Sequence, residues 1–187
     1  MPNFCSNDVH IDLKKDVDVK DFISKIGHFA NDGSDRFQID FEKIVPSNGL
    51  SECSNDWCIE NWGTKWNVFD GRFDQYNRIE KMPHGHRIHL DLWTAWSPPE
   101  PIFQRLCEMD EVSFLRSDCF EEGVQFYGVY HWYNQRLDLS RFDRIDFWFH
   151  VKNYTLNEYY EQHEWLFEDD EESWLKEKEE IIKRMES

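Results

Sequence analysis

The sequence predicts an α+β protein: a ferredoxin-like βαββαβ sandwich with extra strands and an acidic helical C-terminal segment. Two patterns in the chain of 187 residues support this prediction. Segments with apolar residues at every second position are typical of half-buried strands, and segments with apolar residues every three or four positions are typical of helices. Up to residue 132 these segments follow the order strand, helix, strand, strand, helix, strand. We expect the sandwich to span residues 1–152 and the acidic segment residues 153–187.

The first strand and the first helix are predicted from the N-terminal residues. Apolar and polar residues alternate over 9–13, which indicates a half-buried strand. Apolar residues recur with helical spacing over 19–30, so an amphipathic helix follows, with Asp16 or Asp18 as its N-cap. The Asn-Asp-Gly sequence at 31–33 is expected to end this helix.

The central part of the chain is predicted to supply further strands. Alternation of apolar residues predicts strands at 37–41, at 57–59 and at 88–92. The intervening residues 67–85 are polar and contain glycine and proline, so we expect a long loop there.

The second helix is predicted to begin at Ser97-Pro98-Pro99-Glu100. Serine is expected to cap it, proline suits its first turn, and glutamate three residues after the serine completes a capping box. An apolar stripe over 102–109 forms the buried face of this helix. Alternation then predicts one strand that begins at 112, further strand structure over 124–132 and a last strand at 143–151.

The C-terminal segment differs in composition from the rest of the chain. A second capping box, Thr155-Leu156-Asn157-Glu158, predicts the start of a helical region. Residues 158–187 contain twelve acidic and four basic residues, a net charge of −8, and the other 157 residues carry −9. A helical stripe within 156–186 is a possible seam for a homodimer, and its apolar residues are Trp174, Leu175, Ile181, Ile182 and Met185.

Net charge and cysteine content limit the classes of function. A net charge of −17 repels nucleic-acid phosphates, and the sequence shows no basic patch, so we expect a basic protein partner and no direct nucleic-acid contact. The chain opens without a basic start and apolar stretch, and no apolar run is long enough to cross a bilayer. With an odd number of cysteines, five, the expected location is the cytoplasm, with reduced thiols and no membrane partner.

Several segments within residues 1–132 resemble the YubB-like ferredoxin-like domain family of phages and conjugative plasmids. They are MPNFCSN at the N-terminus, FEKIVP at 41–46, NWGTKW at 61–66, TAWSPPEPIF at 94–103 and GVQFYG at 123–128. The resemblance implies the fold and a mobile-element origin, and hence a host-cell cytoplasm. It implies no catalytic residues and therefore no enzymatic activity.

Three tryptophans, Trp57, Trp62 and Trp66, lie close together around a glycine. The indoles could cover an end of the sheet, or they could form an aromatic platform for single-stranded nucleic acid. The negative charge of the chain favours the structural interpretation.

Histidines and carboxylates are further candidates for a chemical site. His84, His86 and His89, with Cys53 and Cys58 as possible neighbours, could hold a metal, but the Cys spacing is loose and His86 and His89 would point to opposite faces of a strand. A solvated loop is the favoured interpretation. Four carboxylates that could be imagined as metal ligands are expected to face solvent: Glu121, Asp138, Asp143 and Asp146.

The acidic segment is the leading candidate site. The predicted function is a non-enzymatic phage or plasmid protein, without cofactor or metal, that inhibits a host defence protein of the CRISPR or restriction type by occluding its basic nucleic-acid-binding surface. The expected partner-binding residues are Tyr160, Trp165, Glu168, Asp169, Asp170, Glu171 and Glu172. The alternatives are a metal-dependent nucleic-acid-processing enzyme that uses His84, His86 and His89, and a homo-oligomeric structural module.

Overall fold

The computed structural model divides the chain into two compact units, Met1–Arg141 and Phe142–Ser187. It describes residues 3–50, 54–68, 77–121, 123, 126–133, 135–163 and 171–185. The sequence had placed the division near residue 152. The boundary lies earlier because the segment predicted as a last strand, 143–151, is helical and belongs to the C-terminal unit.

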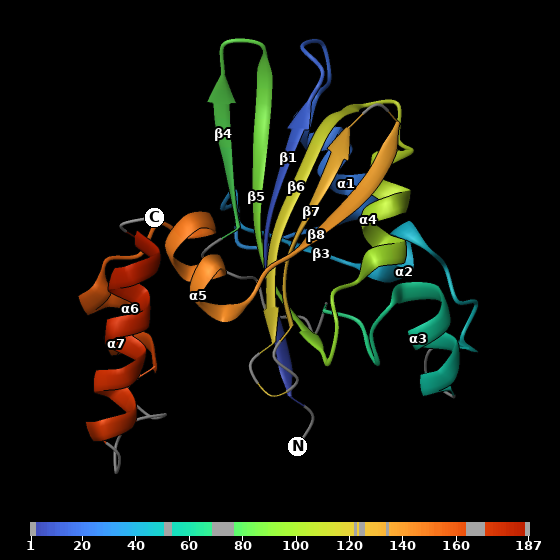
Figure 1. Cartoon of the computed structure of the whole chain (residues 1–187). Coiled ribbons are helices and arrows are strands. Elements are labelled where there is room, and N and C mark those ends of the chain that lie inside the picture. The colour runs from blue at the N-terminus through green and yellow to red at the C-terminus, as the bar shows by residue number, and fades with distance from the viewer. Residues whose placement is uncertain are drawn as a thin grey trace. The chain divides into compact units, whose positions relative to one another are not determined.

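The N-terminal unit is built on a six-stranded antiparallel sheet with strand order β4-β5-β1-β6-β7-β8 (Figure 1). Its strands are β1 (Phe4–Leu13), β4 (Arg78–Met82), β5 (Gly85–Ala95), β6 (Val112–Glu121), β7 (Phe126–Tyr133) and β8 (Arg136–Arg141). The α+β class is therefore confirmed, with the long strand β1 at the centre of the sheet between β5 and β6.

Two helices that contribute to the core of this unit were predicted. The first ends at Ile26 and not near 31–33 as expected, because residues 27–29 form a strand. Helix α1 (Val19–Ile26) begins at Asp18, whose carboxylate accepts hydrogen bonds from the amides of Lys20 and Asp21. Helix α4 (Glu100–Cys107) follows β5. The buried residues of both helices join one hydrophobic cluster with the alternate residues Val9, Ile11 and Leu13 of β1, as expected from the alternation of a strand with one face in the core.

The predicted strand at 37–41 is only partly correct. Phe37–Ile39 forms β3, which pairs with β2 (Gly27–Phe29) in a separate two-stranded sheet. Phe41 instead begins the short helix α2 (Phe41–Ile44), because the Asp40 carboxylate caps the amide of Glu42. One edge strand of the large sheet, β4, lies within the segment 67–85 that was predicted to be a loop.

The predicted strand at 57–59 is wrong, because this segment is helix α3 (Asn55–Trp62). The Ser54 hydroxyl accepts a hydrogen bond from the amide of Trp57 and caps the helix, and Gly63 ends it in the left-handed conformation, with φ 77°. Glycine adopts this conformation without the steric cost of a β-carbon.

The capping box predicted for the second helix is also wrong. Pro99 occupies the N-cap position of α4, and no side chain caps that helix. The Ser97 hydroxyl instead donates a 2.6 Å hydrogen bond to the carbonyl of Gly63. This bond ties the start of α4 to the end of α3.

The C-terminal unit contains α5 (Arg144–Asp146), the π-helical turn η2 (Phe147–Val151), α6 (Leu156–His163) and α7 (Glu171–Met185). The strand predicted at 143–151 is absent because Asp143 caps α5 and the adjacent Phe147, Trp148 and Phe149 are all buried. A half-buried strand would expose the middle one of these three residues. The capping box at the start of α6 is confirmed, since Thr155 and Glu158 exchange hydrogen bonds of 2.8 and 3.3 Å.

Candidate functional site

The predicted acidic site lies only partly within the described residues. Trp165, Glu168, Asp169 and Asp170 lie outside them. Glu171 begins α7, and Glu172 is exposed on that helix and forms a 2.7 Å ion pair with Lys176. Tyr160, the other predicted anchor, packs against Trp174 with ring centroids 4.6 Å apart. The structure thus places the aromatic anchor of α6 against α7.

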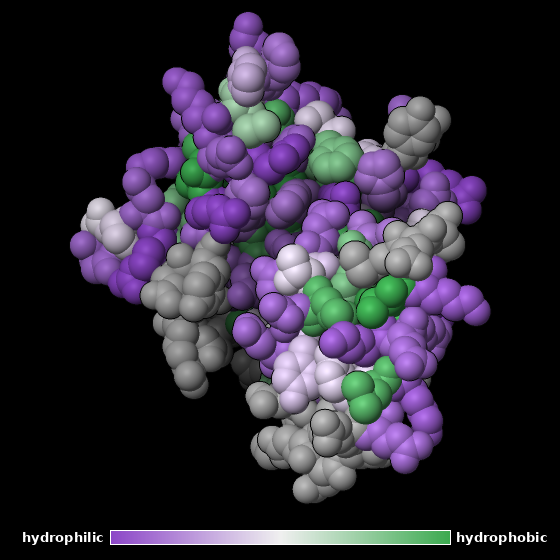
Figure 2. Space-filling view, turned by 60° about the vertical axis from the view of Figure 1, so that its left-hand side comes forward, coloured by the Kyte–Doolittle hydropathy of each residue, from purple (hydrophilic) through white to green (hydrophobic). Residues whose placement is uncertain are grey.

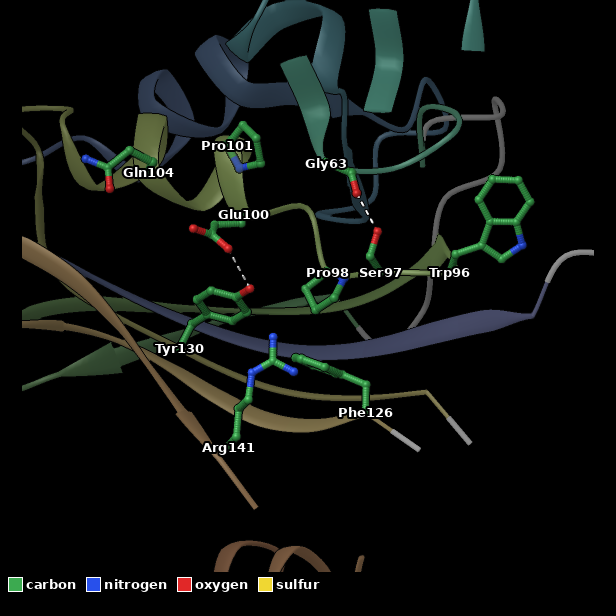
Figure 3. Close-up of a pocket in the computed structure, with 10 residues that line it drawn as sticks. All are labelled: Gly63, Trp96, Ser97, Pro98, Glu100, Pro101, Gln104, Phe126, Tyr130 and Arg141. Carbon is green, nitrogen blue, oxygen red and sulfur yellow. Dashed lines mark hydrogen bonds between the residues drawn. The ribbon is translucent and has the colours of Figure 1, made fainter. Parts of the chain in front are cut away.

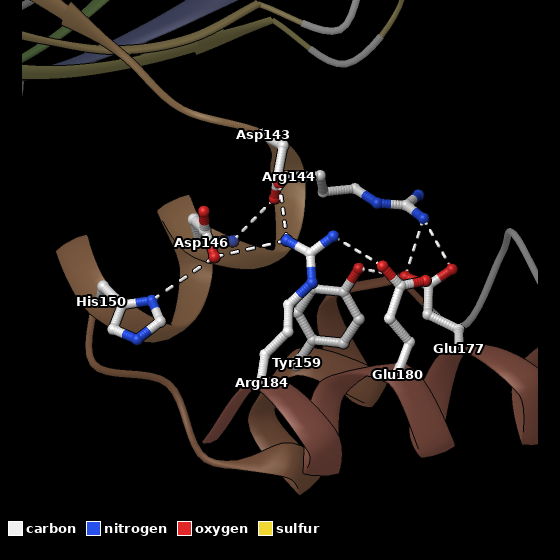
Figure 4. A network of polar contacts seen from close by, with 8 residues as sticks. All are labelled: Asp143, Arg144, Asp146, His150, Tyr159, Glu177, Glu180 and Arg184. Atoms are coloured by element: carbon white, nitrogen blue, oxygen red, sulfur yellow. Dashed lines mark hydrogen bonds and ion pairs between the residues drawn. The ribbon is translucent and has the colours of Figure 1, made fainter. Parts of the chain in front are cut away.

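A network of charged side chains connects α5, α6 and α7 (Figure 4). The guanidinium of Arg144 donates to both carboxylate oxygens of Glu177 at 2.7 Å. The hydroxyl of Tyr159, a buried residue of α6, donates to the same carboxylate. Glu177 therefore fixes the position of α7 relative to α5 and α6.

Arg184 forms the second half of the network. Its guanidinium contacts Asp143 at 2.6 Å, Asp146 at 3.4 Å and Glu180 at 2.6 Å. The hydrogen bond to Asp143 is the main reason that the pKa of Arg184 is raised. Burial opposes the ionisation of Asp143, but hydrogen bonds from the Asp146 amide and from Arg184 outweigh it, so the pKa of that carboxyl lies below its ordinary value.

The three clustered tryptophans have different environments. Trp62 is buried, and its indole N–H donates a 2.9 Å hydrogen bond to the carbonyl of Val45. Its ring makes edge contacts with Phe41 at 5.9 Å and with Trp57 at 5.4 Å. The interpretation as structural support fits Trp62 and Trp57, whereas Trp66 belongs to a surface cluster.

That cluster, the aromatic surface, consists of Phe4, Trp66, Trp93, Trp96 and the cation Lys65. Phe4, Trp93 and Trp96 are 52%, 51% and 44% exposed. The Phe4 ring lies 6.5 Å from both Trp66 and Trp93, and the Lys65 ammonium lies 5.0 Å from the centre of the Trp96 ring. Exposed aromatic residues in contact with one another are typical of binding surfaces.

The face in Figure 2 carries mainly hydrophilic side chains, with hydrophobic ones gathered in small groups. A cluster of neighbouring exposed aromatic residues is therefore unusual on a chain with a net charge of −17. The sequence showed these tryptophans but gave no sign that Phe4 and Trp93 face solvent together. That arrangement follows from the pairing of β1 with β5, which sets Phe4 opposite Ala95 and Ser6 opposite Trp93.

A pocket of about 620 Å³ adjoins the aromatic surface at Trp96 (Figure 3). It is lined by Gly63, Trp96, Ser97, Pro98, Glu100, Pro101, Gln104, Phe126, Tyr130 and Arg141. The Tyr130 hydroxyl donates a 2.9 Å hydrogen bond to the Glu100 carboxylate. Burial is the main reason, and this bond the second, that the pKa of Tyr130 is raised. The phenol therefore stays protonated as a donor.

The three histidines considered as metal ligands are not brought together. His89 on β5 contacts Glu80 at 2.9 Å and Arg78 at 3.3 Å. His86 lies three residues earlier on the same strand and so points to the opposite face. Cys58 is buried, and Cys53 lies outside the described residues. Within the described part of the chain, no group of three or more metal-ligating side chains is close enough to hold an ion.

The four carboxylates that were expected to face solvent are also dispersed. Asp138 is paired with Arg136 on β8, whereas Asp143 and Asp146 belong to the network of the C-terminal unit. Glu121 is buried, with 1% of its surface exposed, and accepts a 3.0 Å hydrogen bond from the amide of Gly123. The expectation of solvent exposure is therefore wrong for Glu121, because the turn after β6 folds its backbone onto that carboxylate.

No family model, no curated protein and no solved structure matches this chain. None of the helices in the described residues is long and apolar enough to cross a membrane.

Proposed function

We propose that the protein is a non-enzymatic binding protein with a ferredoxin-like body, encoded by a phage or plasmid. Its acidic C-terminal unit occupies the basic, nucleic-acid-binding surface of a host protein in the host cytoplasm. The class of partner that fits best is a defence protein of the CRISPR or restriction type, which would be inhibited by this occlusion.

The strand order supports the ferredoxin-like part of the proposal. In a split βαβ unit, a further strand lies between the two strands that a helix connects. Helix α1 lies between β1 and β4 in the sequence, and β5 lies between those strands in the sheet. Helix α4 connects β5 with β6, and β1 lies between them. Strands β7 and β8 are then additions at one edge.

The pairing of charges in the C-terminal unit is the observation that supports the binding function. Arg144, Lys176 and Arg184 are all engaged by carboxylates of the same unit. Each of these pairs neutralises one acid with one base. The whole unit, residues 142–187, has fourteen acidic and six basic residues, so a net charge of −8 is available to an external partner. A surface of one sign attracts a partner of the opposite sign and accelerates their association.

The aromatic residues of this unit provide candidate contacts of higher energy. Tyrosine and tryptophan are enriched among the residues that dominate binding energy at protein interfaces. Tyr160 is held against Trp174, which reduces the freedom that it would lose on binding. Trp165 and the acidic run 168–172 follow Tyr160 within the same segment. We therefore assign affinity to the aromatic residues and partner selection to the acidic ones.

The proposal is tested by reversing charges and measuring affinity for a partner captured from host lysate. Lysine at positions 168–170 should weaken binding at least about tenfold and reduce its dependence on salt concentration, because fewer charge pairs would form. A matched control reverses three exposed acids of the N-terminal unit, Asp16, Glu60 and Asp110. If the two triple variants bind with equal affinity and equal salt dependence, the acidic segment does not recognise the partner.

A further inference from the structure

The pocket beside the aromatic surface has two walls of different origin (Figure 3). Helix α4 and the residues before it supply Pro98, Glu100 and Pro101. The strands β7 and β8 supply Phe126, Tyr130 and Arg141. Because these walls belong to one core and one sheet, the pocket is pre-formed, and its volume of about 620 Å³ suits a small organic molecule.

Two opposite charges face this pocket without forming an ion pair with each other. Glu100 accepts the hydrogen bond from Tyr130, which leaves further acceptor positions on its exposed carboxylate. The Arg141 guanidinium lies over the ring of Phe126, 5.0 Å from its centre. Among the described residues, no carboxylate pairs with Arg141, whereas Arg116, Arg136 and Arg144 all have such a partner.

Stacking on an aromatic ring orients a guanidinium and leaves the N–H groups at its edge available. Arg141 is therefore placed to bind a carboxylate through two parallel hydrogen bonds. Glu100 can accept hydrogen bonds from an ammonium group. Phe126, Pro98 and Pro101 also line the pocket and offer apolar surface to a ligand.

The backbone at the mouth of the pocket shows strain. Trp96 has φ 68°, a left-handed conformation that is uncommon for a bulky residue. Its amide is held by a 2.9 Å hydrogen bond to the carbonyl of Asn3, and the next residue, Ser97, is held by Gly63. Strained residues of this kind occur preferentially at binding sites.

We propose that this pocket binds a small zwitterion with an aromatic body, of the class of aromatic α-amino acids. Arg141 binds the carboxylate, Glu100 binds the ammonium group, and the aromatic side chain lies against Phe126 and the two prolines. Polyanions such as oligonucleotides are disfavoured, because they would meet Glu100 in the pocket and a protein with a net charge of −17 outside it. This inference is independent of the function proposed for the C-terminal unit.

Isothermal titration calorimetry on the full chain tests the proposal with L-phenylalanine, 3-phenylpropanoate and phenethylamine. The last two compounds lack the ammonium and the carboxylate group respectively. L-Phenylalanine should bind at least about tenfold more tightly than either, because each charged hydrogen-bonded contact contributes at least that factor. Absence of saturable binding of phenylalanine, tyrosine and tryptophan at millimolar concentration would overturn the proposal, as would equal affinity for the three probes.

Two variants assign the charges to the groups of the ligand. Arg141→Gln should weaken L-phenylalanine binding at least about tenfold and leave phenethylamine binding unchanged, and Glu100→Gln should weaken L-phenylalanine but not 3-phenylpropanoate. The controls are Arg136→Gln on the same strand and Glu108→Gln at the end of the same helix, where both charges are in exposed ion pairs. Equal effects of Arg141→Gln and Arg136→Gln, or binding of a thymidine decamer that depends on Arg141, would refute the assignment.

Discussion

Replacement of Trp62 by alanine should destabilise the N-terminal unit by about 4 kcal/mol. The indole is 1% exposed, and a buried tryptophan removes roughly 200 Å² from water, which corresponds to about 5 kcal/mol as an upper estimate. Measured substitutions of large core aromatics by alanine cost about 3–5 kcal/mol. The lost hydrogen bond to the carbonyl of Val45 accounts for about 1 kcal/mol of that range.

The assay is hydrogen exchange of peptides from β1, because it reports on the unfolding of the N-terminal unit alone. Trp96→Ala is the matched control: Trp96 is 44% exposed, so the same area estimate gives at most about half the loss expected for Trp62, about 2 kcal/mol. Trp62→Phe keeps one six-membered ring but loses the rest of the indole together with its N–H donor, and should cost about 1–2 kcal/mol. If Trp62→Ala and Trp96→Ala lower the free energy of unfolding equally, the division of the tryptophans into core and surface residues is wrong.

Three further predictions concern a turn, an ion pair and the thiols. Gly63→Ala should lower the free energy of thermal unfolding by about 1 kcal/mol or more beyond the loss caused by Gly33→Ala. Both glycines have φ 77°, but of the two only Gly63 has a neighbour, Pro101, that an added β-carbon would meet, at 2.7 Å. Glu177→Gln should lower the protection of α7 amides from hydrogen exchange by about 1–3 kcal/mol. Glu172→Gln, in an exposed ion pair, should lower it by about 0.5 kcal/mol or less. Equal protection in the two variants would show that Glu177 does not fix the position of α7. Burial raises the pKa of Cys5 and of Cys107 to about 12. Neither thiol should be alkylated by iodoacetamide in the folded protein at pH 8. Above about pH 9 each thiol should lower the free energy of unfolding by up to about 1.4 kcal/mol per pH unit, because only the unfolded thiol ionises there. Rapid alkylation of the native protein would show that these sites open.

The regular elements of the core were predictable because local pattern and tertiary environment agree. β1 and β5 alternate between the core and the other face of the sheet, and α1 has both its cap, Asp18, and its apolar stripe in the sequence. The same holds for the capping box at Thr155, whose residues lie within four positions of each other. Such local signals need no knowledge of the rest of the chain.

The errors arose where two periodicities competed. Residues 143–151 alternate in hydrophobicity, but Ile145, Trp148 and Phe149 also have helical spacing, and all three are buried. At α3 the cap Ser54 and the terminating Gly63 were better indicators than the short alternation between them. β4 was missed because its residues Arg78, Glu80 and Lys81 are exposed, as suits an edge strand, and therefore show no apolar pattern.

The pocket could not be predicted from the sequence, because its residues come from segments that only the sheet brings together. Gly63 ends a helix that was predicted as a strand, and Arg141 is the last residue of β8. In the sequence, Arg116, Arg136 and Arg141 look alike, because each has an aspartate two positions later. Only the structure distinguishes Arg141: Arg116 and Arg136, the other arginines of β6 and β8, are paired with aspartates, whereas no carboxylate of the described residues pairs with Arg141.

The two proposed sites differ in a property that separates them experimentally. The acidic segment acts through a surplus of one charge, so its binding should weaken steeply as salt screens that field. The pocket presents one positive and one negative group, Arg141 and Glu100, and its ligand has no net charge, so its affinity should change little with salt. Measuring the affinity of each ligand at low and high ionic strength therefore assigns that ligand to its site. A strong dependence on salt indicates the acidic segment, and a weak dependence indicates the pocket.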